Sequence, residues 1–384
     1  MCLGLGLAGA VAVGLGRFAY ALVLPAMQAA LGWSYSEAGS LNAANSAGYL
    51  IGALLAVRVG QWLGMRRAFA YGTLCAAIAL LLTAFSSELG TLLVLRFVPG
   101  MFGAVAFVIG GLFAAQIAAS MGARGSTGIA LFYTGPGIGM LAAGLTVPFL
   151  LEWSGDWRYA WVGLGCAACV AAVLAVAATR YIVTETSAPD PRPASGVTLT
   201  PALLSYFLFA AGYIGYMTFI MATVREQGST PGEAAMWWLL MACAAIASFW
   251  VWGALLAAAN GRALAALNSM CALGALLPLV DTRPLVLAVS FVLFAGSFMV
   301  VVAATTNMVR LARAPGQWAR WIGFFTISFG LGQIVGPLLG GVAADVVGRA
   351  DAVLWMSGGL LAGAAICAWW QPSTLQPRVG ADTL

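Results

Sequence analysis

Charge is what this sequence has least of. Charged residues make up 8% of its 384 positions, against about a quarter in a soluble globular domain, and hydrophobic residues make up 62%. Lysine and histidine are both absent, so all 17 basic residues are arginine. Histidine ligands, histidine bases and lysine Schiff bases are therefore excluded, and we expect no metal and no cofactor. The arginines are scattered between apolar runs, so nucleic-acid binding is excluded as well.

Long hydrophobic runs fill the chain instead. A helix needs about 20 apolar residues to cross the hydrocarbon core of a bilayer. The runs between charged or turn-rich breaks predict an all-α integral membrane protein with twelve spans. These expected spans are 3–30, 40–57, 67–85, 89–119, 126–150, 158–179, 200–224, 234–257, 263–280, 284–309, 320–344 and 352–370.

The least apolar stretch divides the chain in two. Residues 183–198 are rich in proline, serine and threonine and carry both signs of charge, which is typical of a solvated linker. We therefore expect an N-terminal bundle of six helices over 1–180, a cytoplasmic linker over 181–199 and a C-terminal bundle of six helices over 200–384.

The arginines also predict an orientation. Two of the 17, Arg17 and Arg96, fall in the interior of spans rather than at their ends or in loops. If the N-terminus is cytoplasmic, eleven others fall in the inside loops and tail, and four fall outside, which is a clear positive-inside bias. The apolar stretch at the N-terminus lacks a basic leader and is too long for a signal peptide. We expect a multi-pass protein of a bacterial inner membrane with both termini in the cytoplasm. The four outside arginines are Arg158, Arg225, Arg283 and Arg349.

The two halves are related by an internal repeat at an offset of 196 residues. "GRFAY" at 16–20 corresponds to "GYIGY" at 212–216, and "SYSEAG" at 34–39 corresponds to "TPGEAA" at 230–235. The second pair predicts two helix-starting capping boxes. Six spans per repeat give both halves the same orientation, and solute sites in such parallel repeats lie near the midplane between the halves.

Glycine and proline recur inside the predicted spans. Glycines four residues apart form a flat stripe on which another helix packs closely, and a proline inside a span permits bending. We expect helix-packing or gating roles for these residues. They are Gly100 in "RFVPGMFGA", Gly135, Pro136 and Gly139 in "YTGPGIGML", and Gly332, Gly336 and Pro337 in "GLGQIVGPLLGG".

These stretches resemble the major facilitator superfamily (MFS) of transporters over nearly the whole chain. The Arg96 and Gly135-Pro136 stretches resemble its helix-4 and helix-5 motifs, the latter often associated with antiporters. "GLGRFAYALVLPAM" and "LGWSYSEAGSLNAANSAGYLIGAL" are similar to its YbfB/YjiJ-like bacterial branch. The resemblance implies two six-helix bundles that work by alternating access.

The loop between spans 2 and 3 departs from the pattern of the superfamily. In "GQWLGMRRA", Gly64, Arg66 and Arg67 match its most widespread motif, but Gln61 stands where an aspartate is usual. The usual charge clamp from loop to helix is therefore in doubt.

Arg17 and Arg96 are the strongest candidates for a site. At 1.5 Å per residue, both are expected about 20 Å from the inner face, with no acid in any predicted span to neutralise them. An ionisable residue inside a membrane indicates function by default, although Arg17 and Arg96 could each be structural. Further candidates for solute contact are Tyr20, placed on the Arg17 face by helical spacing, and Tyr213, Tyr216, Asn307 and Gln333. Tyrosine beside arginine suits an aromatic carboxylate.

Four functions remain open. The leading one is a secondary transporter of a small, anionic organic solute, acting as a monomer in the lipid bilayer, with or without a coupling ion. The alternative is a proton-coupled exporter of hydrophobic or cationic compounds, which the helix-5 motif favours but which usually needs an acid in the cavity. A sensor or scaffold has no extra domain to support it. An enzyme has no nucleophile–base pair, and we expect none.

Overall fold

The computed structural model describes residues 1–121, 125–181, 197–252 and 260–373. These residues form helices joined by short loops, and none of them belongs to a strand. Twelve helical segments are long and apolar enough to cross a membrane, as the sequence predicted. The chain is therefore an all-α, multi-pass integral membrane protein.

The first six spans come from the first half of the chain. The first of them changes helix type midway, because α1 (Cys2–Gly9) runs into the π-helix η1 (Ala10–Phe18) and then into α2 (Tyr20–Leu31). The other five are α3 (Tyr35–Leu63), α4 (Met65–Leu82) with η2 (Thr83–Phe85), α5 (Leu89–Ser120), α6 (Gly125–Tyr133) with α7 (Gly135–Ser154), and α8 (Trp157–Ala178) with η4 (Thr179–Tyr181).

The second half supplies the other six spans. Of the predicted linker between the halves, residues 182–196 lie outside the described part of the chain. The second set consists of α9 (Thr200–Glu226), α10 (Pro231–Val251), α12 (Gly261–Val280), α13 (Pro284–Ala312) with η5 (Pro315–Gln317), α14 (Trp318–Val347) and α15 (Asp351–Trp369).

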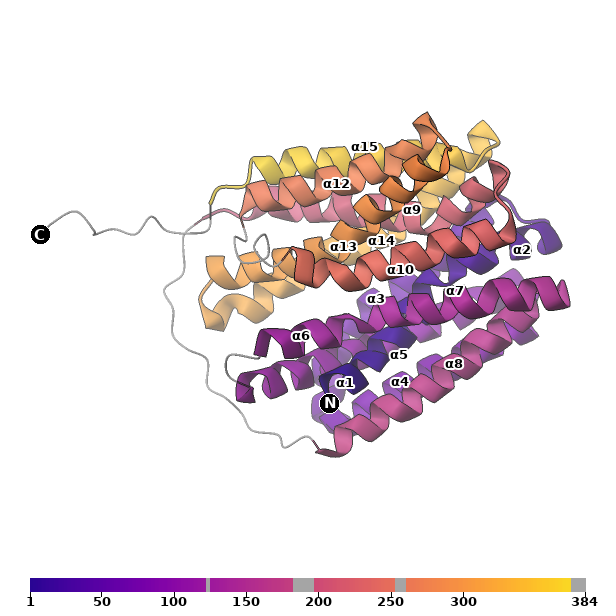
Figure 1. Cartoon of the computed structure of the whole chain (residues 1–384). Coiled ribbons are helices and arrows are strands. Elements are labelled where there is room, and N and C mark those ends of the chain that lie inside the picture. Colours follow the sequence, from indigo (N-terminus) through magenta and orange to yellow (C-terminus); the bar gives the residue numbers. More distant parts are fainter. Residues whose placement is uncertain (122–124, 182–196, 253–259, 374–384) are drawn as a thin grey trace, which may run out of the picture.

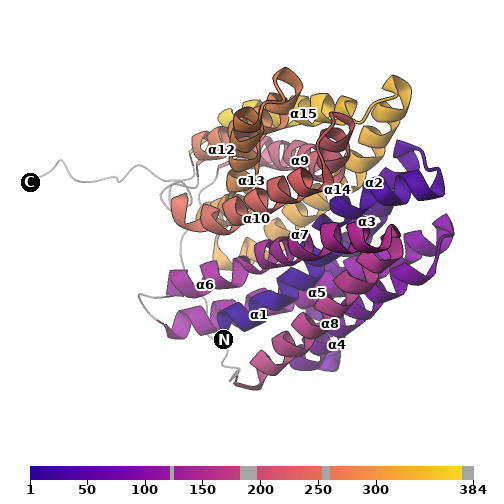
Figure 2. The ribbon, with the colours of Figure 1, turned by 45° about the vertical axis from the view of Figure 1, so that its right-hand side comes forward.

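The twelve spans form two bundles side by side. In Figure 1 α9 to α15 gather above and α1 to α8 below, except for α2, which reaches the level of α10 at the right, and the turned view in Figure 2 shows the same arrangement. The first span is 94% buried over its most apolar window and the seventh, α9, is 89% buried, against 33–56% for the others. The corresponding helices of the two repeats therefore lie innermost.

The repeated capping boxes are both formed. At the start of α3, as predicted, the Ser34 hydroxyl accepts a hydrogen bond from the backbone N–H of Glu37, and the Glu37 carboxylate accepts one from the backbone N–H of Ser34. Thr230 and Glu233 do the same at the start of α10. Each box satisfies two N–H groups that a helix start leaves without an intrahelical partner.

Several helices run beyond the apolar stretches that predicted them. α3 begins at Tyr35 rather than near residue 40 and so contains Glu37, and α14 continues to Val347 and contains Asp345. The expectation that no span contains an acid is therefore wrong at the helix ends. The reason is that capped, polar turns extend a helix past its apolar core without ending its hydrogen bonding.

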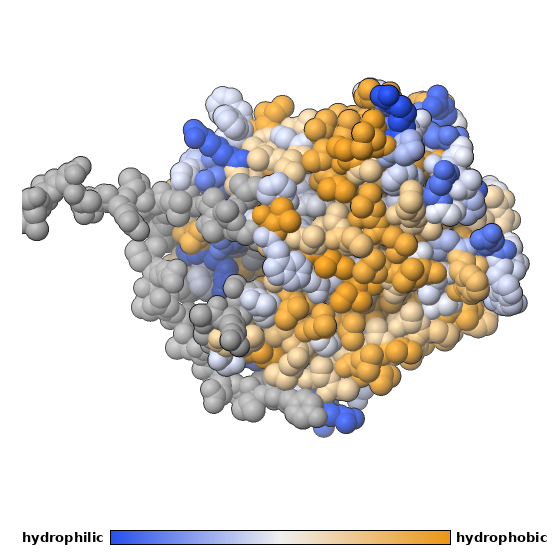
Figure 3. Space-filling model, viewed as in Figure 1, coloured by the Kyte–Doolittle hydropathy of each residue, from blue (hydrophilic) through white to orange (hydrophobic). Residues whose placement is uncertain are grey.

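Apolar side chains cover the middle of the outer surface. Figure 3 shows them across the centre of one face, with hydrophilic residues towards its ends. Exposed residues such as Phe149, Val170 and Trp355 would be costly in water, whereas a lipid environment accepts them. The surface thus fits a bilayer.

The bundles are joined at the end of the molecule distal to the N-terminus. The Asp345 carboxylate of α14 accepts hydrogen bonds from the backbone N–H groups of Tyr35 (2.7 Å) and Ser36 (3.0 Å) and from the Ser36 hydroxyl. The Tyr35 hydroxyl donates in turn to Glu226 at the end of α9. We call these four residues the distal contact. It ties the start of α3 to the opposite bundle.

Candidate functional site

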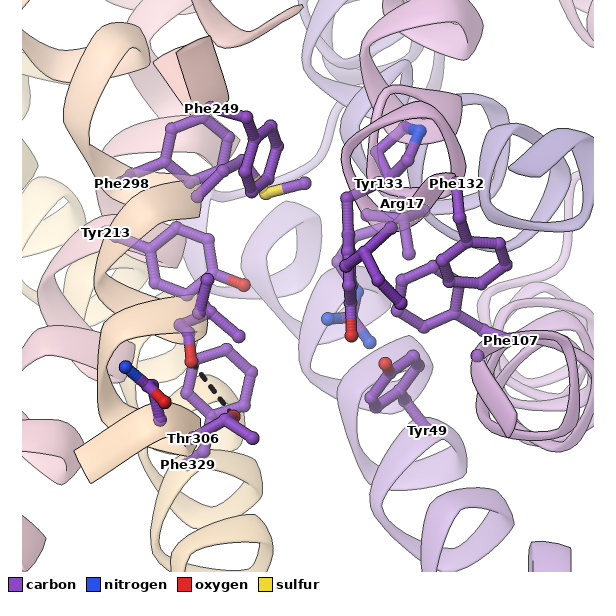
Figure 4. A pocket seen from close by; sticks show the side chains of 18 of the residues that line it. Arg17, Tyr49, Phe107, Phe132, Tyr133, Tyr213, Phe249, Phe298, Thr306 and Phe329 are labelled. Atoms are coloured by element: carbon purple, nitrogen blue, oxygen red, sulfur yellow. Dashed lines mark hydrogen bonds between the residues drawn. The ribbon is translucent and has the colours of Figure 1, made fainter. Parts of the chain in front are cut away.

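A cavity of about 280 Å³ lies between the two bundles. Its polar lining comes from Arg17, Tyr49, Tyr133, Tyr213, Thr306, Asn307 and Arg310, and no acid is among the described residues that line it. The lining includes Ala115, near the end of α5, and Ile129, one turn into α6, so the cavity extends from Arg17 towards the end opposite the distal contact. In Figure 4, Arg17, Tyr49, Phe107, Phe132 and Tyr133 face Tyr213, Phe249, Phe298, Thr306 and Phe329.

Arg17 is held by two uncharged groups. It lies in the π-helix η1 and is 2% exposed. Its Nε donates to Asn45 Oδ1 at 3.0 Å, and its guanidinium carbon lies 4.3 Å from the centre of the Tyr49 ring. No hydrogen-bond partner of Nη2 lies among the described residues. Since a guanidinium stays ionised, the cavity wall carries an uncompensated positive charge.

Arg96 lies behind this wall rather than in it. Its side chain is fully buried, and its guanidinium carbon lies 5.0 Å from the Tyr20 ring and 5.1 Å from the Trp161 ring. Its backbone carbonyl accepts a hydrogen bond from Asn45 Nδ2 at 3.0 Å. The two arginines, predicted at similar depth, therefore share a contact with Asn45, but only Arg17 lines the cavity.

Tyr20 does not share the cavity face of Arg17. Its hydroxyl donates to the carbonyl of Ala38 at 2.8 Å, and its ring stacks on Trp161. The predicted common face assumed α-helical spacing, but Arg17 lies in a π-helix that ends before Tyr20. A π-helix closes each hydrogen-bonded ring with one residue more, which rotates the later side chains away from the expected face.

Tyr213 faces Arg17 from the other bundle. Its hydroxyl accepts a hydrogen bond from Gln333 Nε2, and its ring stacks on Phe298 and Phe329. Gln333 thus reaches the cavity through Tyr213 rather than as one of its lining residues. Asn307 lines the cavity, whereas Tyr216 packs its buried ring against Phe294, 3.9 Å away, outside the lining.

The aromatic lining is the part of the site that the sequence analysis did not find. Six phenylalanines line the cavity. Phe18 follows Arg17 in η1, and the other five come from α5, α6, α10, α13 and α14, so no local pattern unites them. One local signal was present, because Asn45 and Tyr49 are four residues apart on α3 and both face Arg17. The five are Phe107, Phe132, Phe249, Phe298 and Phe329.

The predicted packing glycines meet the backbone of a facing helix. A methyl group at any of them would overlap with a carbonyl oxygen of that helix, so only glycine allows such an approach. Pro136 lines the cavity beside them, and the carbonyl oxygen of Pro337 faces Gly39 across the bundles. The glycines and the residues whose oxygens they face are Gly100 with Asn45, Gly135 with Gly6, Gly139 with Ala10, Gly332 with Phe207 and Gly336 with Ala211.

The motif between α3 and α4 lies away from the cavity. Gly64 takes a φ of +85°, which lets the chain turn between the two helices. Arg66 donates to the carbonyl of Thr179 at the end of α8, and Arg67 is exposed. This hydrogen bond joins two segments of the same bundle.

A family match agrees with this architecture. The family described as "Uncharacterised MFS-type transporter YbfB" matches residues 9–369. The chain belongs to this family. No curated protein matches the sequence.

Solved structures of MFS-type transporters share the fold of this family member. The nucleoside transporter NupG matches with a TM-score of 0.69 at 14% identity, over 96% of this chain and 98% of its own. The human organic anion transporter MFSD10 matches with a TM-score of 0.63 at 16% identity, over 96% of this chain and 98% of its own. The peptide transporter POT matches with a TM-score of 0.70 at 13% identity, over 96% of this chain and 93% of its own. At these identities the likeness establishes the MFS fold of two six-helix bundles related by a parallel repeat. In such repeats the interface where the cavity lies is the usual place of a solute site.

Proposed function

We propose that this protein is a secondary active transporter of a small organic anion and that the cavity between the bundles is its solute site. The uncompensated charge of Arg17 carries the proposal. A buried charge is costly without a counter-charge, and no acid lines the described cavity to supply one. An anion that enters with its carboxylate towards Arg17 removes this cost, while the aromatic walls accept its apolar part.

A second cation supports the same solute class. Arg310 lines the cavity near the end of α13, further from the distal contact than Arg17. Two cations along one cavity raise the local concentration of anions and disfavour cations. The family relation supports the more general function, because its description names a transporter.

The orientation follows from the arginines. With more arginine in the loops and tail on the side of the N-terminus, that side is cytoplasmic in a bacterial inner membrane. The cavity then extends towards the cytoplasm, and the distal contact closes the outer side. The molecule is an inward-facing state of one functional monomer.

Transport then follows from rocking of 1–180 against 200–384. The glycine crossings within each bundle at Gly100, Gly135 and Gly336 keep its helices packed, while the contacts between the bundles break and re-form. The solute is exposed to each side in turn because both bundles contribute to the cavity wall.

The decisive measurement is a thermal-shift screen of the purified protein against carboxylates, phosphates, amines and neutral aromatic compounds. We expect carboxylates to stabilise it, and Arg17→Gln to lower their affinity at least about tenfold, since hydrogen bonds to charged groups contribute about 1.5–3 kcal/mol. Arg283→Gln, in an exposed loop, is the matched control. Anion binding and flux that survive Arg17→Gln unchanged would overturn the proposal.

The aromatic lining favours one second candidate, a proton-coupled exporter of hydrophobic compounds. Six phenylalanines give the cavity the adaptable apolar walls that such compounds need. Proton coupling would then fall to an acid outside the cavity, of which Glu37 is the first on the chain. Efflux driven by a pH gradient and abolished by Glu37→Gln would favour this function over anion transport.

A further inference from the structure

Asn45 is fully buried and does not line the cavity, but it contacts Arg17, which does. Its amide bridges two fixed groups. The oxygen accepts from Arg17 Nε at 3.0 Å, and the nitrogen donates to the carbonyl of Arg96 at 3.0 Å. Because a guanidinium only donates and a carbonyl only accepts, the amide can take only this orientation.

Tyr49 completes the hold on Arg17 from the same face of α3. It follows Asn45 by one helical turn, and the central carbon of the guanidinium lies over its ring, 4.3 Å from the ring centre. Asn45 thus occupies Nε and Tyr49 contacts the guanidinium, while Nη2 has no partner among the described residues. Figure 4 shows Tyr49 and Arg17 together on one side of the cavity, opposite Tyr213.

Both groups that hold Arg17 are uncharged, although a carboxylate could accept the same hydrogen bond. A carboxylate at position 45 would neutralise Arg17 and set an oxygen against the Arg96 carbonyl. From this geometry we infer that Asn45 and Tyr49 are positioning residues whose neutrality determines the charge selectivity of the cavity. They orient the guanidinium and leave its full charge to the solute.

The inference rests on the proposed function and deepens it. It assigns the anion preference at the Arg17 end of the cavity to the charge of that residue and to the two neutral groups that leave this charge uncompensated. It predicts that a single carboxylate beside Arg17 cancels this charge and lowers the preference of the cavity for anions, while Arg310 still lines its other end.

A test that requires no known solute uses a cysteine reporter. Ala303 lines the cavity and none of the seven cysteines does, so Ala303→Cys places a thiol there. The remaining cysteines are replaced by alanine in the full-length protein. The ratio of the reaction rates with an anionic and with a cationic methanethiosulfonate of similar size reports the sign of the charge in the cavity.

We expect Asn45→Asp to lower this anion-to-cation rate ratio at least tenfold. Asn45→Leu removes the hold but leaves the charge, so it keeps the ratio within about threefold of the parent. A merely structural role would give the two variants the same ratio. Asn268→Asp is the matched control, because Asn268 is equally buried but bonds Ser205 within the other bundle.

Tyr49→Glu provides a second route if Asn45→Asp does not fold. It places a carboxylate at the lining, against the face of the same guanidinium, and should lower the ratio as well, whereas Tyr49→Phe should not. A ratio that falls in Arg17→Gln but stays unchanged in folded Asn45→Asp or Tyr49→Glu would overturn the inference. A ratio unchanged even in Arg17→Gln would instead overturn the proposed anion preference itself.

Discussion

Asp345→Asn should shift the protein towards the state that is open at the distal contact. In the present state the two carboxylate oxygens accept from the N–H groups of Tyr35 and Ser36 at 2.7 and 3.0 Å. Asparagine keeps one oxygen that can accept from one of these N–H groups, but its NH₂ group faces the other N–H, so two donors meet and that hydrogen bond is lost. A hydrogen bond to a charged group contributes about 1.5–3 kcal/mol, and the exposed setting of Asp345 reduces this to about 1–2 kcal/mol. The equilibrium between the two states should therefore move about 5- to 30-fold.

The assay measures access to a buried position behind the distal contact. Phe219 is fully buried and packs against Tyr35, so Phe219→Cys in a variant without other cysteines reacts only when the contact opens. With an impermeant maleimide, Asp345→Asn should raise the labelling rate by the same 5- to 30-fold. Asp281→Asn, whose carboxylate bonds Arg283 within its own loop, should leave the rate unchanged. An equal rate in the Asp345 and Asp281 variants would refute the reasoning.

Further predictions concern the glycine contacts and the interface. Gly139→Ala should lower stability by about 1–3 kcal/mol through overpacking against η1, measured as a fall in Tm. A methyl group at Gly296 would have no neighbouring atom within 4 Å, so Gly296→Ala should instead raise stability by up to about 1 kcal/mol, because alanine favours a helix over glycine. A loss of stability in both variants would contradict the packing argument. A disulfide between Gly144→Cys and Leu239→Cys, which joins α7 to α10, should abolish flux until it is reduced, and flux through a completely crosslinked protein would count against rocking.

The sequence predicted the parts of this structure that depend on composition and local pattern. Twelve apolar runs gave twelve spans, and two Ser/Thr-x-x-Glu patterns gave two formed capping boxes, at Ser34 and Thr230. Arg17 could be assigned to a cavity wall because an arginine with no nearby acid needs water or a ligand in a membrane.

The rest depends on contacts between distant segments. The π-helix before Tyr20 has no signature in an apolar, glycine-rich run, so its rotation of the later side chains could not be foreseen. We expected that Arg96 could face the cavity, but the rings of Tyr20 and Trp161 lie against its guanidinium instead. Trp161 is 65 positions further along the chain than Arg96, so no local pattern relates the two. The role of Asn45 as a bridge between two arginines is visible only once three helices are packed.

The start of α3 has two independent sets of partners, and this makes the distal contact easy to release. Asp345 occupies the N–H groups of Tyr35 and Ser36, whereas the capping box with Ser34 satisfies the N–H of Glu37 from within the helix itself. When the bundles separate, only two N–H groups lose their partner, and both then meet water. The first turn of α3 therefore stays wound in either state, so release of the distal contact itself exchanges a few solvent-accessible hydrogen bonds and needs no refolding of the helix.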